Sequence, residues 1–177
     1  MALIVDGKEI KNTYKINYNG TSLDKIVCDG VTVWERLPVE KVYLTNLSAS
    51  TYAKAVGSKV VVNNVVIRLG EALPTTLYYD FSMYLNDVFH ARIWYGSIDA
   101  GDVEEFITFD TPYTYDVLKT DTDDVWFNFV FYTVVNGEEI LVDMGSYGAA
   151  LQTEKLYAGD TKTLWSNYSS ADVYVPS

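Results

Sequence analysis

Four Asx-Gly pairs divide this sequence into short segments and constrain its fold more than any other feature. They are Asp6-Gly7, Asn19-Gly20, Asp29-Gly30 and Asn136-Gly137. A type I′ hairpin turn requires a positive φ at both central residues, and Asx-Gly pairs adopt that conformation readily. Each pair therefore predicts a reversal between two antiparallel strands. The composition agrees, because 15 Tyr, 7 Phe and 4 Trp residues favour strands.

Alternation of apolar and polar residues marks the longest predicted strands. Residues 77–85 show the period of a strand with one face on a core. Asn86-Asp87 then predicts a turn into a strand with an apolar face of Phe89, Ala91, Ile93 and Tyr95, and with His90 and Arg92 opposite. Residues 125–143 form a second predicted hairpin, in which Val135 pairs with Glu138 and three residues point inward: Phe127, Phe129 and Phe131.

The spacing of these strands predicts an all-β fold, namely an antiparallel β-sandwich of immunoglobulin-like or jelly-roll kind. Shorter strands are expected at residues 41–47, 59–69 and 103–109. Asn63-Asn64 leaves open whether residues 59–69 form one strand or a tight hairpin. Cys28 is the only cysteine, so an immunoglobulin-like sandwich would lack the usual disulfide.

Pro38 marks the predicted boundary between two domains. Residues 1–38 are expected to form a small β-meander, and residues 39–177 a β-sandwich domain that ends in an extended arm over residues 158–177. A segment shorter than about 40 residues rarely buries enough apolar surface to be stable without a metal, a disulfide or a partner. The N-terminal domain is therefore expected to dock on another protein.

The charge of the chain excludes several classes of partner. Lys and Arg number 13 against 24 Asp and Glu, which gives a net charge of −11. Such a surface repels nucleic-acid phosphates and anionic lipid headgroups. No apolar run approaches the ~18 residues that suggest a membrane span. The first residues lack the basic lead and apolar stretch of a secretory signal, so synthesis in a cytoplasm is expected.

Residues 14–35 carry a motif with three parts. It consists of an Asn19-Gly20-Thr21 turn, an Asp29-Gly30 turn, and a final strand, Val31-Thr32-Val33-Trp34-Glu35. This pattern resembles a module common in structural proteins of tailed bacteriophages. The resemblance implies a non-enzymatic virion protein of the tail, baseplate or head surface that is made in the host cytoplasm and attaches to other virion proteins. The docking residues it implies are Asn19, Gly20, Asp29, Gly30, Val33 and Trp34. Self-association within a symmetric assembly is expected of such a part.

Aromatic residues outside this motif are candidate ligand or subunit contacts: Trp94, Tyr95, Trp126, Trp165 and Tyr168. A platform on which sugar rings stack could be formed by six aromatic residues: Trp94, Tyr95, Tyr113, Tyr115, Trp126 and Tyr132. Tyr and Trp are equally favoured at protein interfaces. The sequence therefore leaves open an alternative function, a receptor- or carbohydrate-binding module on a phage tail with a host surface glycan as its ligand.

Catalytic and metal-binding patterns do not emerge from the sequence. His90 is the only histidine, and Gly145-Ser146-Tyr147-Gly148 lacks the Gly-x-Ser-x-Gly spacing of a nucleophile elbow. The segment 121–124 begins like a calcium loop, but Trp126 and Tyr132 stand where an EF-hand has glycine and glutamate. We therefore predict no cofactor and no enzyme. A looser calcium site is left open, built from Asp121, Asp123 and Asp124 with Asp99 or Asp102.

Overall fold

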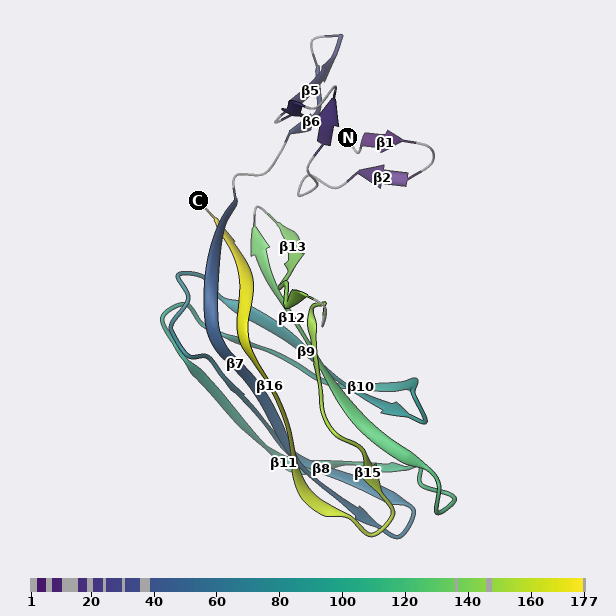
Figure 1. The fold of residues 1–177 in the computed structure, drawn as a ribbon. Coiled ribbons are helices and arrows are strands. Elements are labelled where there is room, and N and C mark those ends of the chain that lie inside the picture. The colour runs from purple at the N-terminus through teal and green to yellow at the C-terminus, as the bar shows by residue number, and fades with distance from the viewer. Residues whose placement is uncertain are drawn as a thin grey trace.

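The structure is a computed structural model that describes residues 3–5, 8–10, 16–18, 21–23, 25–29, 31–35, 39–135, 137–145 and 148–176. The elements named in these residues are all strands, and two antiparallel sheets pack face to face over residues 39–176 (Figure 1). The predicted all-β sandwich is confirmed. The described residues include no helix that is long and apolar enough to cross a membrane.

Each sheet of the sandwich has a defined strand order. Within the described residues, one sheet has the order β10-β9-β12-β13, with β14 and β15 also paired to β12, and the other has the order β11-β8-β7-β16. The strand bounds are Val39–Val56 for β7, Lys59–Arg68 for β8, Leu77–Leu85 for β9, Val88–Ile98 for β10, Glu104–Asp116 for β11, Asp124–Val135 for β12, Glu138–Leu141 for β13, Ala150–Gln152 for β14, Leu156–Tyr157 for β15 and Thr161–Pro176 for β16.

The N-terminal strands pair as consecutive hairpins that are separate from the sandwich sheets. Among the described residues, β1 pairs only with β2, β3 only with β4, and β5 only with β6. Their bounds are Leu3–Val5, Lys8–Ile10, Ile16–Tyr18, Thr21–Leu23, Lys25–Cys28 and Val31–Glu35. Isolated two-stranded ribbons are marginally stable in water at best.

The reversals predicted from the Asx-Gly pairs are confirmed by the register of the flanking strands. In each case the two residues that bracket the pair face each other in an antiparallel ladder: Val5 with Lys8, Tyr18 with Thr21, Cys28 with Val31, and Val135 with Glu138. Asn86 and Asp87 also turn as expected, because both have positive φ, 48° and 65°.

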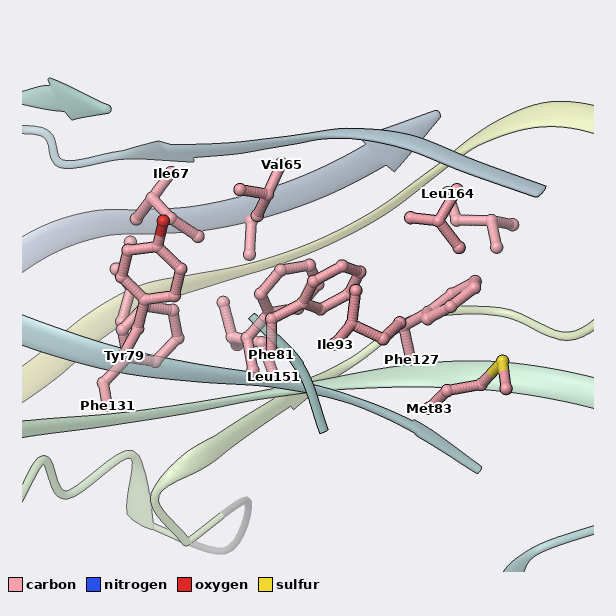
Figure 2. Close-up of a cluster of buried hydrophobic side chains, with 14 of the residues drawn as sticks. Val65, Ile67, Tyr79, Phe81, Met83, Ile93, Phe127, Phe131, Leu151 and Leu164 are labelled. Atoms are coloured by element: carbon pink, nitrogen blue, oxygen red, sulfur yellow. The ribbon is translucent and has the colours of Figure 1, made fainter. Parts of the chain in front are cut away.

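The core lies between the inner faces of the two sheets (Figure 2). The alternate residues Tyr79, Phe81, Phe127, Phe129 and Phe131 are fully buried, so the predicted inward faces of β9 and β12 are correct. The Phe81 and Phe129 rings stack at a centroid distance of 4.6 Å. The facing sheet contributes smaller aliphatic residues, including Leu47, Val65 and Ile67. Large side chains on one sheet therefore pack against branched ones on the other.

The C-terminal residues predicted to be an extended arm form strand β16 instead. This strand pairs with β7 from Thr161 opposite Lys54 to Pro176 opposite Val39. Its buried residues, Leu164, Ala171, Val173 and Val175, join the core. The sequence concealed the strand because β16 is the edge of its sheet, so most of its outward residues are polar.

Residues 59–68 form the single strand β8, which resolves the question that Asn63-Asn64 left open. The irregularity instead lies within the paired ladder of β7 and β8, because residues 63–65 of β8 stand opposite only residues 51–52 of β7, so that β8 carries the extra residue of a bulge. The Asn64 side-chain oxygen accepts a hydrogen bond from the Tyr52 N–H at 2.8 Å, and the Asn64 carbonyl accepts one from the Thr51 hydroxyl at 2.6 Å. The polar pair therefore satisfies backbone groups beside a bulge.

Replacing Phe129 by alanine should lower the free energy of unfolding by about 3–5 kcal/mol, because it empties part of a fully packed core. Urea denaturation of the full chain measures the change. Phe106→Ala is the matched control, since this phenylalanine is 60% exposed and its loss should change stability by no more than about 0.5 kcal/mol. Equal effects of the two substitutions would contradict the close packing of Phe129 in the core.

Candidate functional surfaces

Hairpin β5–β6 exposes apolar side chains next to its turn. Val27 and Val31 are 52% and 55% exposed, and Cys28 is also exposed. Of the predicted docking residues, Asp29 has a φ of 50° in the turn and Val33 is half-buried. Asn19, Gly20, Gly30 and the Trp34 side chain lie outside the described residues.

Strand β10 places Trp94 and Tyr95 on opposite faces of its sheet. Trp94 packs against the core, with its ring 5.5 Å from that of Phe109. Phe89 and Tyr95 are 57% and 71% exposed, which corrects the prediction that both share one apolar core face with Ile93. The reason is two register shifts in β10, between Phe89 and Ala91 and between Arg92 and Trp94, because each extra residue in a strand reverses the direction of the side chains beyond it.

Trp126 lies at the other end of this sheet, on its outer face. There it forms an aromatic cluster with Tyr84 and Phe89, called the outer cluster below. The Trp126 ring stacks on Tyr84 at 4.2 Å, and Phe89 meets Tyr84 edge-on at 5.8 Å. Trp94 instead lies on the core side. The two tryptophans therefore do not share one platform, and Tyr113 and Tyr115 pack against the core from the opposite sheet.

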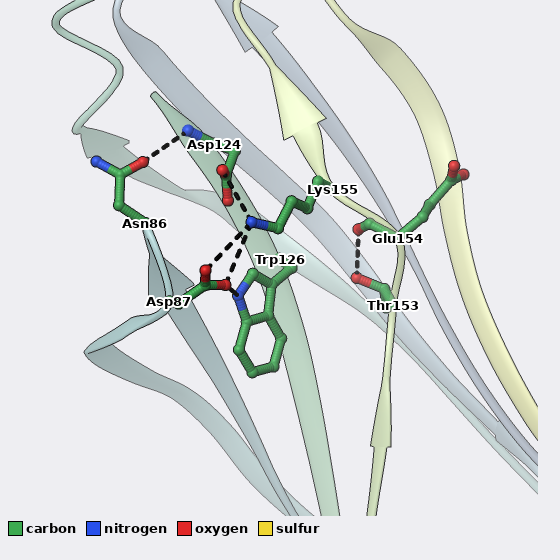
Figure 3. A network of polar contacts seen from close by, with 7 residues as sticks. All are labelled: Asn86, Asp87, Asp124, Trp126, Thr153, Glu154 and Lys155. Carbon is green, nitrogen blue, oxygen red and sulfur yellow. Dashed lines mark hydrogen bonds and ion pairs between the residues drawn. The ribbon is translucent and has the colours of Figure 1, made fainter. Parts of the chain in front are cut away.

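Polar contacts hold the Trp126 ring in place (Figure 3). Its indole N–H donates to an Asp87 carboxylate oxygen at 2.9 Å. Lys155 makes ion pairs with Asp87 at 3.2 Å and Asp124 at 3.0 Å, and this pairing raises the pKa of Lys155. The outer cluster is thus fixed by contacts from the β9–β10 turn and from the segment after β14.

Trp165 and Tyr168 lie together in a groove between β14 and β16. The groove has a volume of about 600 Å³ and is lined by residues 150–153 and 165–168. Trp165 is 61% exposed, whereas Tyr168 is half-buried and packs against the core. Among the aromatic residues predicted as contacts, Trp165 and Tyr168 therefore lie together at a concave surface. The sequence held no signal for the groove itself, because its two walls come from strands in different sheets.

Two of the acidic residues considered for calcium, Asp123 and Asp124, are engaged in other contacts. The Asp123 carboxylate accepts hydrogen bonds from the backbone N–H groups of Lys119 and Thr120 and from the Asn86 amide, and these bonds lower its pKa. Asp124 is paired with Lys155. Within the described residues, no group of three or more His, Cys, Asp and Glu side chains is placed to hold a metal ion.

Three buried polar atoms inside the sandwich influence one another, although none makes a hydrogen bond of good geometry to a described residue. They are the Tyr79 hydroxyl, the Trp94 Nε1 and one Glu105 carboxylate oxygen. Burial raises the pKa of both Tyr79 and Glu105, and the Glu105 charge raises that of Tyr79 further. The Tyr79 hydroxyl fits against residue 96 because that residue is glycine. A Cβ atom at this position would lie 2.6 Å from the hydroxyl oxygen, which is too close for a non-bonded contact. Sequence reasoning missed the group, since alternation alone marks Tyr79 as a core residue.

Comparisons of the chain with protein-family models, with curated proteins and with solved structures gave no match.

Glu105→Gln should stabilise the protein at neutral pH. The raised pKa means that the folded state favours the protonated carboxyl, so this contribution is present below the unfolded-state pKa, about 4.3, and is lost as the pH rises through the folded-state value. The advantage of the variant should therefore shrink toward pH 4, as measured by urea denaturation at both pH values. Glu138→Gln, at an exposed site, is the control. An equal gain at both pH values would contradict this account.

Proposed function

We propose that the chain is a non-enzymatic structural protein of a bacteriophage particle. In this proposal the N-terminal hairpins attach it to other virion proteins, and the β-sandwich is displayed or connects to a neighbour. Support comes from the motif at residues 14–35, which resembles a phage module, and from the separation of the N-terminal pairing from that of the sandwich. The protein would be made in the host cytoplasm and reside in the virion.

One observation carries the proposal: hairpin β5–β6 has exposed apolar residues, whereas the sandwich is complete without it. Val27 and Val31 leave more than half of their surface in solvent. Strands β7 to β16 meanwhile bury a continuous core of their own. Burying exposed valines in a partner stabilises the complex by roughly 25 cal/mol per Å² of apolar surface. The N-terminal hairpins therefore gain stability by docking, and the sandwich does not need them.

A symmetric assembly would repeat this contact between copies or between different subunits. Unpaired strand edges offer a second mode of attachment, because an extended segment can add to the edge of a sheet. The alternative platform for glycan stacking on Trp94 and Trp126 is not favoured, since Trp94 packs against the core and Trp126 lies on the outer face of the sheet.

Deleting residues 1–38 should leave a folded sandwich that no longer joins particles. The truncated chain is expected to melt cooperatively within a few degrees of the full chain, because the core lies wholly in residues 39–176. Incorporation is measured by complementing a phage that lacks the gene and probing purified particles for the protein. Normal incorporation of the truncated chain would refute the proposal.

Val27→Asp combined with Val31→Asp should reproduce the assembly defect in the full-length chain, because both substitutions place charge on the proposed docking surface. The melting temperature of the sandwich should not change. Val103→Asp provides the matched control, since Val103 is an exposed valine of the sandwich and its substitution should leave incorporation intact. Equal incorporation of the double variant and the control would contradict a docking role for this hairpin.

A further inference from the structure

The groove between β14 and β16 is the concave surface on which the sandwich places an exposed tryptophan. Its volume of about 600 Å³ falls within the 300–1,000 Å³ typical of sites for small ligands. It opens where the edges of the two sheets approach each other, since β14 pairs with β12 and β16 pairs along its length with β7. The groove thus has one wall from each sheet.

The lining of the groove carries no charge. Residues 150–153 contribute Ala, Leu, Gln and Thr, and residues 165–168 contribute Trp, Ser, Asn and Tyr. The neighbouring charges are paired with each other, because Lys162 lies 3.4 Å from Glu154 and 3.6 Å from Asp160. An anionic ligand would find no cation in the lining, and a cationic ligand would find no carboxylate. The chemistry of the groove therefore favours a neutral ligand.

Three polar side chains in the lining have hydrogen-bonding capacity to spare. Gln152, Ser166 and Asn167 make no side-chain hydrogen bond to a described residue, whereas the Thr153 hydroxyl already accepts from the Phe127 N–H and donates to the Glu154 carbonyl. The amides of Gln152 and Asn167 each offer donors and an acceptor, and the Ser166 hydroxyl offers both. A ligand rich in hydroxyl groups can use all three.

Trp165 adds an apolar surface to these polar groups. Trp165 is 61% exposed. Its side chain lies on the same side of β16 as that of Asn167, which is two positions further along the strand. An aromatic ring beside neutral amides suits a ligand with both apolar C–H faces and hydroxyl groups. Sugar rings have this combination.

We infer that the groove between β14 and β16 binds a neutral oligosaccharide, with Trp165 stacking on a sugar ring and Gln152, Ser166 and Asn167 bonding its hydroxyls. An extended peptide is the competing occupant, since it could add to a strand edge. Strand β14 is only three residues long, Ala150–Gln152, so it offers a short ladder to a peptide. The free side chains favour the sugar. This inference concerns the isolated chain and does not depend on attachment to a particle.

The test screens the full chain against an array of neutral and anionic glycans and then titrates the neutral trisaccharides that bind by calorimetry. Trp165→Ala should weaken binding about tenfold or more, because it removes the stacking surface. Asn167→Asp keeps the shape of the side chain but loses its donors and adds a charge, so it should also weaken binding. Tyr95→Ala is the matched control, an exposed aromatic on the other sheet that should bind as the unaltered chain does.

The same variants distinguish a sugar from a peptide. Strand addition uses backbone hydrogen bonds, so a peptide found in a random extended-peptide library should bind Asn167→Asp as well as the unaltered chain. Melting temperatures of all variants should agree with that of the unaltered chain, because both substituted groove residues are exposed. The inference is overturned if no neutral glycan binds, if binding persists in Trp165→Ala, or if only peptides bind. Failure here leaves the proposed attachment role standing, since that role is measured on particles.

Discussion

Strand β12 is the element on which the rest of the sandwich depends. Strands β9, β13, β14 and β15 all hydrogen bond to it. Its inward phenylalanines are fully buried against the opposite sheet, while its outward Trp126 belongs to the outer cluster. The strict alternation of this strand separates the two environments. Any register slip would exchange them and expose the core residues, so the register of the entire sheet is strongly specified.

The β9–β10 turn is tied to the beginning of β12 by reciprocal contacts. The Asn86 N–H donates to the Asp124 carbonyl and the Asp124 N–H donates to the Asn86 side chain, both at 3.0 Å. This arrangement places Asp87 where it can accept from the Trp126 indole. The orientation of the ring therefore follows from the turn geometry. Inside the sandwich, by contrast, Tyr79 and Glu105 bring together buried polar atoms that make no hydrogen bond of good geometry to a described residue.

The sandwich and the N-terminal hairpins differ in how much of their apolar surface they bury within the chain. In the sandwich, β16 pairs with β7 along its length, and buried residues of this pair such as Val173 face the core. Hairpin β5–β6 has exposed valines, and the N-terminal hairpins pair only among themselves in the described residues. A self-sufficient domain joined to marginal hairpins suits attachment and display. The groove beside Trp165 would give the displayed part a ligand of its own.

Local sequence patterns determined the turns and the inward faces of the longest strands. Asx-Gly pairs require unusual backbone angles, and strict alternation predicts which side chains are buried, so Phe127 to Phe131 and the turn at Val135–Glu138 could be predicted without a structure. Only the tertiary structure decided the direction of Tyr95, the pairing of β16 and the groove at Trp165. A bulge changes the phase of a strand without a distinctive residue, and an edge strand is stabilised by a neighbour far away in the chain. The groove exists because the edges of two sheets lie beside each other, and no local sequence pattern encodes how closely two sheet edges approach.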